Sequence, residues 1–181
     1  MSDGRVVDSK CLSYVLRHRP ESIGITLDGS GWVAIDALLA AAARSGHVIS
    51  PEALREVINA PGKRRFEVRG ERIRAAQGHS VPVDLGLEPV PPPAVLYHRT
   101  VARFLPGILA QGRRPGKRRH VHLSADTGTA AVVGARRGRP LILQVNAAAM
   151  HAAGHEFFRA ANGVWLTPPS RLASSSHGPV P

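Results

Sequence analysis

The sequence holds a single cysteine, Cys11, among 181 residues. One thiol can form neither an internal disulfide nor a cluster of thiolate metal ligands. Aromatic residues make up only 4% of the chain, and no stretch reaches the roughly 18 to 20 consecutive apolar residues of a membrane span. The first ten residues also lack the basic and apolar regions of a signal peptide. We therefore expect a soluble, cytoplasmic protein with no membrane partner.

Acidic residues are scarce in the second half of the chain. Residues 1–90 hold 12 lysines and arginines against 11 acidic residues, whereas residues 91–181 hold 12 against 2. Because clustered cations attract phosphate groups and release their counterions, this asymmetry favours a polyanionic partner such as nucleic acid. The arginine bias of a GC-rich genome would also explain the net charge of +11, but it explains the uneven distribution less well.

The first part of the chain combines three predicted helices with a β-hairpin. Ser50 followed by Pro51 is typical of a helix start, because serine caps the first turn and proline fits its first position. Three helices followed by a hairpin are typical of a winged helix, a frequent nucleic-acid-binding module. The expected elements are a helix over residues 8–20, a short strand near Trp32, a helix ending near Gly46, a helix over 50–62 and a hairpin over 64–77 with its turn at Arg69–Arg72.

Proline is concentrated in residues 81–96, which contain five of the 15 prolines. We interpret residues 83–94 as a semi-rigid linker between a first lobe, residues 1–82, and a second lobe, residues 95–181. The second lobe is expected to mix strands and helices, so the predicted fold class is α+β. Its expected elements are strands over 94–100, 120–124 and 140–147 (the last one buried), helices over 103–112 and 127–138, a hairpin over 157–167 turning at Asn162–Gly163, and a frayed tail.

Four basic residues are candidates for binding a phosphate: Arg17, His18, Arg65 and Arg118. Arginine holds a phosphate through a planar fork of donors and keeps its charge, so several arginines suit a phosphate dianion. A neighbouring histidine can exchange a proton during a reaction. From spacing alone, however, an Arg-His pair at the end of a helix more often interacts with the helix dipole.

Histidines also alternate along two predicted strands. Residues 118–124, RRHVHLS, place two histidines and a serine on one face of a strand and two apolar residues on the other. Residues 96–100, LYHRT, repeat this arrangement. Lone histidines on strands usually belong to the core or the surface, but together these positions suggest a pocket for a ribose or pyrophosphate. They are His98, Thr100, His120, His122 and Ser124.

Two further patterns carry less information. The strand histidines could hold zinc, but no acidic residue lies near them and the surrounding arginines would repel a cation, so we expect no metal. The sequence AQGHS at 76–80 follows the hairpin and reads as a polar loop. The chain contains no Walker loop, dinucleotide fingerprint or Ser-His-Asp signature.

Five motifs, in this order, resemble the NAD-dependent RNA 2′-phosphotransferase family: LSYVLRHRPESIGITLDGSGWV, RRFEVRGERIRAAQGHSVPV, LYHRT, RRHVHLS and NGVWLT. The resemblance covers residues 8–167 and implies a winged-helix lobe followed by an ADP-ribosyltransferase-like lobe that binds NAD⁺. It implies an enzyme that removes an internal 2′-phosphate from RNA, such as one left at a tRNA splice junction. In this family the 2′-phosphate attacks C1″ of NAD⁺ and expels nicotinamide. O2″ then attacks the phosphorus, which yields ADP-ribose 1″,2″-cyclic phosphate.

The resemblance also assigns roles to the candidate residues. It implies that the catalytic set is Arg17, His18, Arg65 and Arg118, and that NAD⁺ is bound by His98, Thr100, His120, His122 and Ser124. It does not say which of the two alternating histidines contacts NAD⁺, because both lie on one face. The family usually has glycine where this chain has Arg99, so the Arg99 side chain is expected to point away from the ligand.

Two other functions remain open from the sequence. The first is an ADP-ribosyltransferase that modifies nucleic-acid ends or proteins. Such enzymes commonly use a glutamate on a late strand, and the only acidic residue after Asp126 is Glu156. The second is a winged-helix RNA-binding protein without catalytic activity, which would bind RNA in a salt-dependent way and leave NAD⁺ intact.

Overall fold

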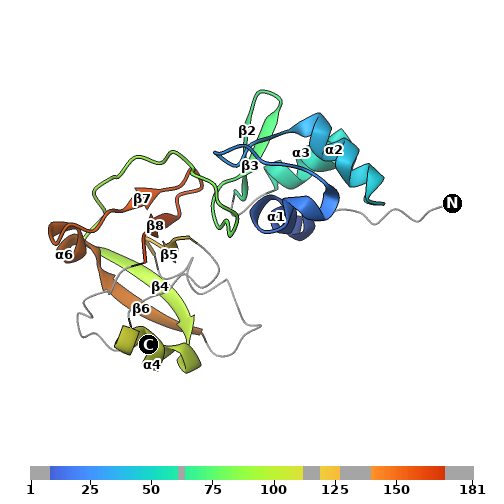
Figure 1. Ribbon diagram of the computed structural model, residues 1–181. Coiled ribbons are helices and arrows are strands. Elements are labelled where there is room, and N and C mark those ends of the chain that lie inside the picture. Colours follow the sequence, from blue (N-terminus) through green and yellow to red (C-terminus); the bar gives the residue numbers. More distant parts are fainter. Residues whose placement is uncertain (1–8, 61–63, 112–118, 127–139, 170–181) are drawn as a thin grey trace. The chain divides into compact units, whose positions relative to one another are not determined.

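The computed structural model contains two compact units, Met1–Gly86 and Leu87–Pro181 (Figure 1). It describes residues 9–60, 64–111, 119–126 and 140–169. Both units mix helices and strands, as the predicted α+β class requires, and each has its own cluster of buried apolar side chains. Within the described residues, no helix is both long and apolar enough to cross a membrane.

The first unit begins with three α-helices: α1 (Ser9–Arg17), α2 (Ile35–Arg44) and α3 (Pro51–Asn59), with a 3-10 turn, η1 (Pro20–Ile23), after α1. Helix α1 buries Leu12, Val15 and Leu16, and this apolar spacing is the pattern that predicted it. Helix α3 begins at the predicted cap, where the Ser50 hydroxyl accepts a hydrogen bond from the Ala53 amide at 3.1 Å.

A three-stranded antiparallel sheet completes the first unit. Strands β1 (Val33–Ala34), β2 (Phe66–Arg69) and β3 (Arg72–Ala75) pair in the order β1-β3-β2. The predicted hairpin is confirmed, and Gly70 occupies its turn with a φ of +56°. Alternation along a strand would put Val68 on the same face as Phe66. Phe66 is buried, whereas Val68 is 45% exposed on β2, which is an edge strand of the sheet.

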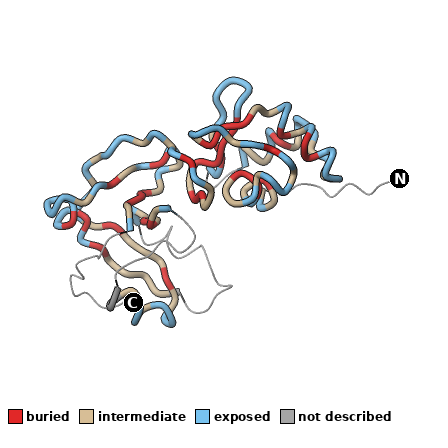
Figure 2. Tube along the Cα trace, viewed as in Figure 1, coloured by how far each residue is buried: buried red, intermediate tan, exposed pale blue. Residues whose placement is uncertain are grey.

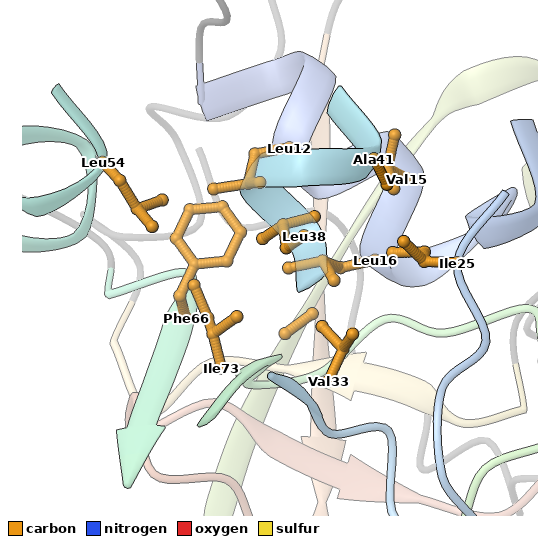
Figure 3. Close-up of a cluster of buried hydrophobic side chains, with 11 residues drawn as sticks. Leu12, Val15, Leu16, Ile25, Val33, Leu38, Ala41, Leu54, Phe66 and Ile73 are labelled. Carbon is orange, nitrogen blue, oxygen red and sulfur yellow. The ribbon is translucent and has the colours of Figure 1, made fainter. Parts of the chain in front are cut away.

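The core of the first unit lies between the hairpin and the helices. Figure 3 shows Phe66 and Ile73 from the hairpin facing Leu54 of α3 and Leu12 of α1. Ile73 is fully buried, and burial of one such side chain contributes roughly 1.5–3 kcal/mol to stability. Figure 2 shows the same buried stretches along α1, α2 and β3. This packing fixes the end of α1 and the start of β2, where three candidate residues lie.

The second unit contains two small sheets. Strand β4 (Val95–Val101) pairs along its whole length with β6 (Pro140–Asn146). The second sheet consists of three strands in the order β5 (Val121–Leu123), β8 (Trp165–Thr167) and β7 (Phe158–Arg159). The amide of Tyr97 and the amide of Ser124 each donate to the other residue's carbonyl at 2.8 Å. This bridge joins the end of β5 to β4.

Most predicted elements of the second unit are confirmed. They are the strands at β4, β5 and β6, the helical segment formed by η2 (Ala102–Phe104) and α4 (Leu105–Gln111), and the hairpin β7–β8 with Gly163 at its turn. Strand β6 is less buried than predicted: of its described side chains, only Val145 is buried. The predicted helix over 127–138 and the tail 171–181 lie outside the described residues.

Helix α6 (Ala147–Ala152) was not predicted. Its cap is Asn146, whose side-chain oxygen accepts a hydrogen bond from the Ala149 amide at 3.0 Å. An asparagine before an alanine-rich run is a helix-start signal, so this element could have been found from the sequence.

Residues at both ends of the predicted linker are hydrogen-bonded within the described structure. The Asp84 amide donates to the Gly29 carbonyl at 2.8 Å, and Val83 is buried. In the second unit, the Val90 amide donates to the Phe157 carbonyl at 2.8 Å. The domain boundaries proposed from the sequence stay a prediction.

Candidate functional site

Arg17, His18 and Arg65 lie together in the first unit. Arg17 is the last residue of α1, and its Nη2 donates to the Arg65 carbonyl at 3.4 Å. Arg65 precedes β2, and its Nη1 donates to the Ser9 hydroxyl at the start of α1 at 2.8 Å. Three of the four predicted phosphate-binding residues thus lie around α1, with Arg17 and His18 at its end and the Arg65 guanidinium bonded at its start. The fourth, Arg118, lies outside the described residues.

The loop that follows β3 packs against the end of α1. The amides of Ser80 and Val81 donate to the Arg17 carbonyl at 2.9 and 3.4 Å, and the Ser80 hydroxyl lies 2.9 Å from His18 Nδ1. Gly78 has a φ of +90°, and a Cβ built there would lie 3.6 Å from Arg17 Cδ. The backbone conformation, rather than a lack of space, therefore favours glycine at this position.

His79, in the same loop, is a buried imidazole with 5% of its surface exposed. Burial lowers the pKa of His79 from 6.5 to about 4, and the positive charges of Arg17, Arg74 and His18 act in the same direction. His79 is therefore neutral at neutral pH. From the sequence, residues 76–80 were interpreted only as a polar loop. The contact of this loop with His18 joins positions 62 residues apart, so no local pattern predicts it.

Arg74 is a buried cation on β3, with 7% of its surface exposed. Its Nη2 lies 3.0 Å from a Glu67 carboxylate oxygen, and its Nη1 donates to the carbonyls of Ser30 and Leu85. The guanidinium also lies over the Trp32 ring, 4.5 Å from its centroid. These contacts hold a positive charge inside the first unit, close enough to influence His79. Arg74 is not among the residues predicted from the sequence to be functional.

In the second unit, His98 contacts β5 directly. Its Nδ1 lies 3.1 Å from the His122 carbonyl oxygen. Because a carbonyl only accepts, Nδ1 carries the proton in this contact, which orients the His98 ring. Thr100, on the same face of β4 as His98, is 9% exposed. This face also carries Leu96, a fully buried core residue, so it is directed into the unit.

The predicted alternation of β5 is confirmed. Val121 and Leu123 are buried in the core of the second unit, and His122 between them is half-buried. His120 lies against Phe158 of β7 in an edge-to-face arrangement, with ring centroids 6.0 Å apart. Ser124 follows β5 and pairs with Tyr97 of β4 through its backbone. Strand β5 and the residues that flank it thus place His120, His122 and Ser124 beside the strand that carries His98 and Thr100.

Arg99 lies between His98 and Thr100 on β4, and the alternation of the strand puts its side chain on the opposite face, as expected. Its Nε is buried and has no hydrogen-bond partner among the described residues. The backbone of Arg99 pairs with Ile142 of β6. Arginine at this position therefore does not place its side chain on the face that carries His98.

A metal centre finds no support in the part of the chain that the structure describes. No group of three or more histidine, cysteine, aspartate or glutamate side chains there is arranged to hold an ion. Of the set weighed from the sequence, the His98 ring contacts the backbone carbonyl of His122, and the His120 ring contacts the Phe158 ring.

Comparison with known proteins agrees with the family suggested by the motifs. Residues 3–169 match the model of the "RNA 2'-phosphotransferase, Tpt1 / KptA family". A "Probable RNA 2'-phosphotransferase" of Streptomyces griseus is 56% identical over 92% of this chain and 93% of that relative. Proteins of the same name from Streptomyces coelicolor and Pseudomonas aeruginosa are 58% and 54% identical, each over 88% of this chain and over 87% and 89% of their own lengths. The chain therefore belongs to the RNA 2′-phosphotransferase family.

Proposed function

We propose that this protein is an NAD⁺-dependent RNA 2′-phosphotransferase that transfers an internal 2′-phosphate from RNA to NAD⁺. The observation that carries the proposal is the family match over residues 3–169. The grouping of Arg17, His18 and Arg65 in the first unit supports it, because such a set suits a phosphate dianion. We place the reaction in the cytoplasm, where RNA and NAD⁺ are both present, and a tRNA splice junction is the kind of substrate it would act on.

In this proposal the first unit binds the RNA. Its three helices and β1-β3-β2 sheet support a winged-helix arrangement. A phosphate dianion is already a nucleophile, so Arg17, Arg65 and Arg118 need only hold it in line with its target and stabilise the charge that develops. His18, which follows α1 next to Arg17, would assist the second step by moving a proton at O2″ or at the RNA 2′-oxygen.

The second unit binds NAD⁺ in an ADP-ribosyltransferase-like lobe. Support comes from the pairing of β4 with β5 at Tyr97 and Ser124, which brings both polar-faced strands together. His98, oriented through its bond to the His122 carbonyl, and Thr100 present polar groups from one face of β4. Displacement of nicotinamide by the 2′-phosphate needs no metal, and attack of O2″ on phosphorus then releases RNA with a 2′-hydroxyl and ADP-ribose 1″,2″-cyclic phosphate.

Two RNAs of the same sequence test this function. One carries an internal 2′-phosphate and the other a 5′-phosphate, and each is incubated with the protein with and without NAD⁺. We expect NAD⁺-dependent dephosphorylation of the first RNA only. A stable ADP-ribose adduct on the 5′-phosphate would instead indicate an ADP-ribosyltransferase of nucleic-acid ends. Binding of both RNAs with NAD⁺ left intact would indicate a non-catalytic RNA-binding protein.

A further inference from the structure

The loop at residues 77–81 is part of the fold around Arg17 and His18, but the reaction described above gives it no role. Its central contact is between the Ser80 hydroxyl and His18 Nδ1, which lie 2.9 Å apart in a partly buried setting. The two residues are 62 positions apart in the sequence. Their contact is therefore created by the fold and not by local helix geometry.

The backbone on either side of Ser80 is fixed to the same candidate residues. The Ser80 amide donates to the Arg17 carbonyl at 2.9 Å, and the Val81 amide donates to it at 3.4 Å. At the other end of the segment, the Ala76 amide donates to the Arg65 carbonyl at 2.9 Å. The loop thus connects the backbones of both arginines, and it holds the serine hydroxyl in a set position relative to the imidazole.

The hydrogen bonds at the Arg17 carbonyl determine where the serine proton points. This oxygen already accepts two backbone amides, and its distance to the Ser80 hydroxyl is a long 3.5 Å. His18 Nδ1, which lies closer to the hydroxyl, is the better acceptor for that proton. Neutral His18 then carries its own proton on Nε2. When His18 is protonated, Nδ1–H donates to the serine oxygen, and the hydroxyl proton turns toward the Arg17 carbonyl.

We propose that Ser80 is a positioning residue that holds the His18 ring and sets its neutral tautomer, so that His18 exchanges protons through Nε2. The inference rests on the proposed function of His18 in RNA 2′-phosphotransfer. A serine hydroxyl suits this task because it donates to the neutral ring and accepts from the protonated one. His18 therefore keeps its orientation through a complete cycle of proton gain and loss.

A spectroscopic measurement on the unmodified protein tests the tautomer directly. Two-dimensional ¹⁵N–¹H spectra of ¹⁵N-histidine-labelled full-length protein distinguish a ring protonated at Nε2 from one protonated at Nδ1. We expect neutral His18 to be protonated at Nε2, with a hydrogen-bonded Nδ1. Protonation at Nδ1 would overturn the proposal. This readout needs no substrate, so it separates failure of the proposal from failure of the proposed function.

Substitution of Ser80 then tests its effect on the reaction. Ser80→Ala should change the ¹⁵N signature of His18 and lower kcat about ten-fold, the effect of losing one hydrogen bond, while KM for RNA and for NAD⁺ stays within two-fold. Ser80→Thr, which keeps the hydroxyl, should restore both. Ser22→Ala is the matched control, because the Ser22 hydroxyl donates to the Arg19 carbonyl near the same helix end without contacting His18. An unchanged His18 signature in Ser80→Ala, or an equal loss in Ser22→Ala, would contradict the positioning role.

Discussion

His79 is expected to make the stability of the first unit depend on pH between 7 and 4. In the folded protein, burial and the nearby positive charges lower the pKa of His79 from 6.5 to about 4. An unfolded chain binds a proton at this histidine below pH 6.5, whereas the folded chain excludes it until about pH 4. The contribution of neutral His79 is therefore fully present above pH 6.5, and it is lost as the pH falls toward 4.

The expected loss follows from the difference between the two pKa values. Each pH unit of difference corresponds to about 1.4 kcal/mol, so unfolding should become easier by about 3 kcal/mol at pH 4 and by about 2 kcal/mol already at pH 5. The interval from pH 7 to 5 is the useful one, because ordinary carboxylates remain largely ionised there.

Urea unfolding of the full chain at pH 7 and pH 5 measures this effect. In a Trp165→Phe background, Trp32 is the remaining tryptophan and its fluorescence reports on the first unit. The free energy of unfolding should fall by about 2 kcal/mol more in the parent protein than in a His79→Gln variant, which has no imidazole to protonate. If both proteins lost the same stability between pH 7 and 5, His79 would not be the buried, uncharged group described above.

Three further substitutions test particular contacts. Arg74→Met should lower the free energy of unfolding by about 3 kcal/mol in urea at pH 7, because it leaves the Glu67 carboxylate partly buried without its partner. Arg55→Met, which removes an exposed ion pair with Glu52, is the control. An equal loss in the two variants would show that the buried pair adds no stability. Thr167→Val removes the bond from a buried hydroxyl to the Glu156 carbonyl and should cost about 1 kcal/mol in thermal unfolding, whereas Thr167→Ser should cost less. Tyr14 is 52% exposed and lies one helical turn before His18. Tyr14→Ala should therefore raise KM for RNA about ten-fold through loss of base stacking, whereas Tyr14→Phe, which keeps the ring, should not. Equal KM values in the two variants would exclude stacking.

Elements with strong local signals were predictable from the sequence. Helix α1 follows from the spacing of its three buried apolar residues, and α3 follows from Ser50 and Pro51. The hairpin β2–β3 and β5 follow from alternation, the hairpin β7–β8 follows from its Asn162–Gly163 turn, and the apolar face expected of β5 is buried in the core. In each case the determining interactions lie within a few residues of one another, so periodicity and capping residues carry the information.

Contacts between distant segments were not predictable in the same way. The sequence offered no means of pairing Ser80 with His18 or of burying His79, because both depend on how the loop after β3 packs against α1. The limited burial of β6 has a similar cause. Its apolar composition predicts a strand, but the exposure of that strand depends on which other elements cover it.

Transfer of the 2′-phosphate to NAD⁺ can be followed with a labelled phosphate. An RNA with one ³²P-labelled internal 2′-phosphate is incubated with the full-length protein, with NAD⁺ and without it, and both the labelled products and nicotinamide are measured. We expect the label to leave the RNA only when NAD⁺ is present and to appear in ADP-ribose cyclic phosphate, with one nicotinamide released for each phosphate removed. Label that stays on the RNA, or that is released as inorganic phosphate without NAD⁺, would show that the protein does not transfer the 2′-phosphate to NAD⁺.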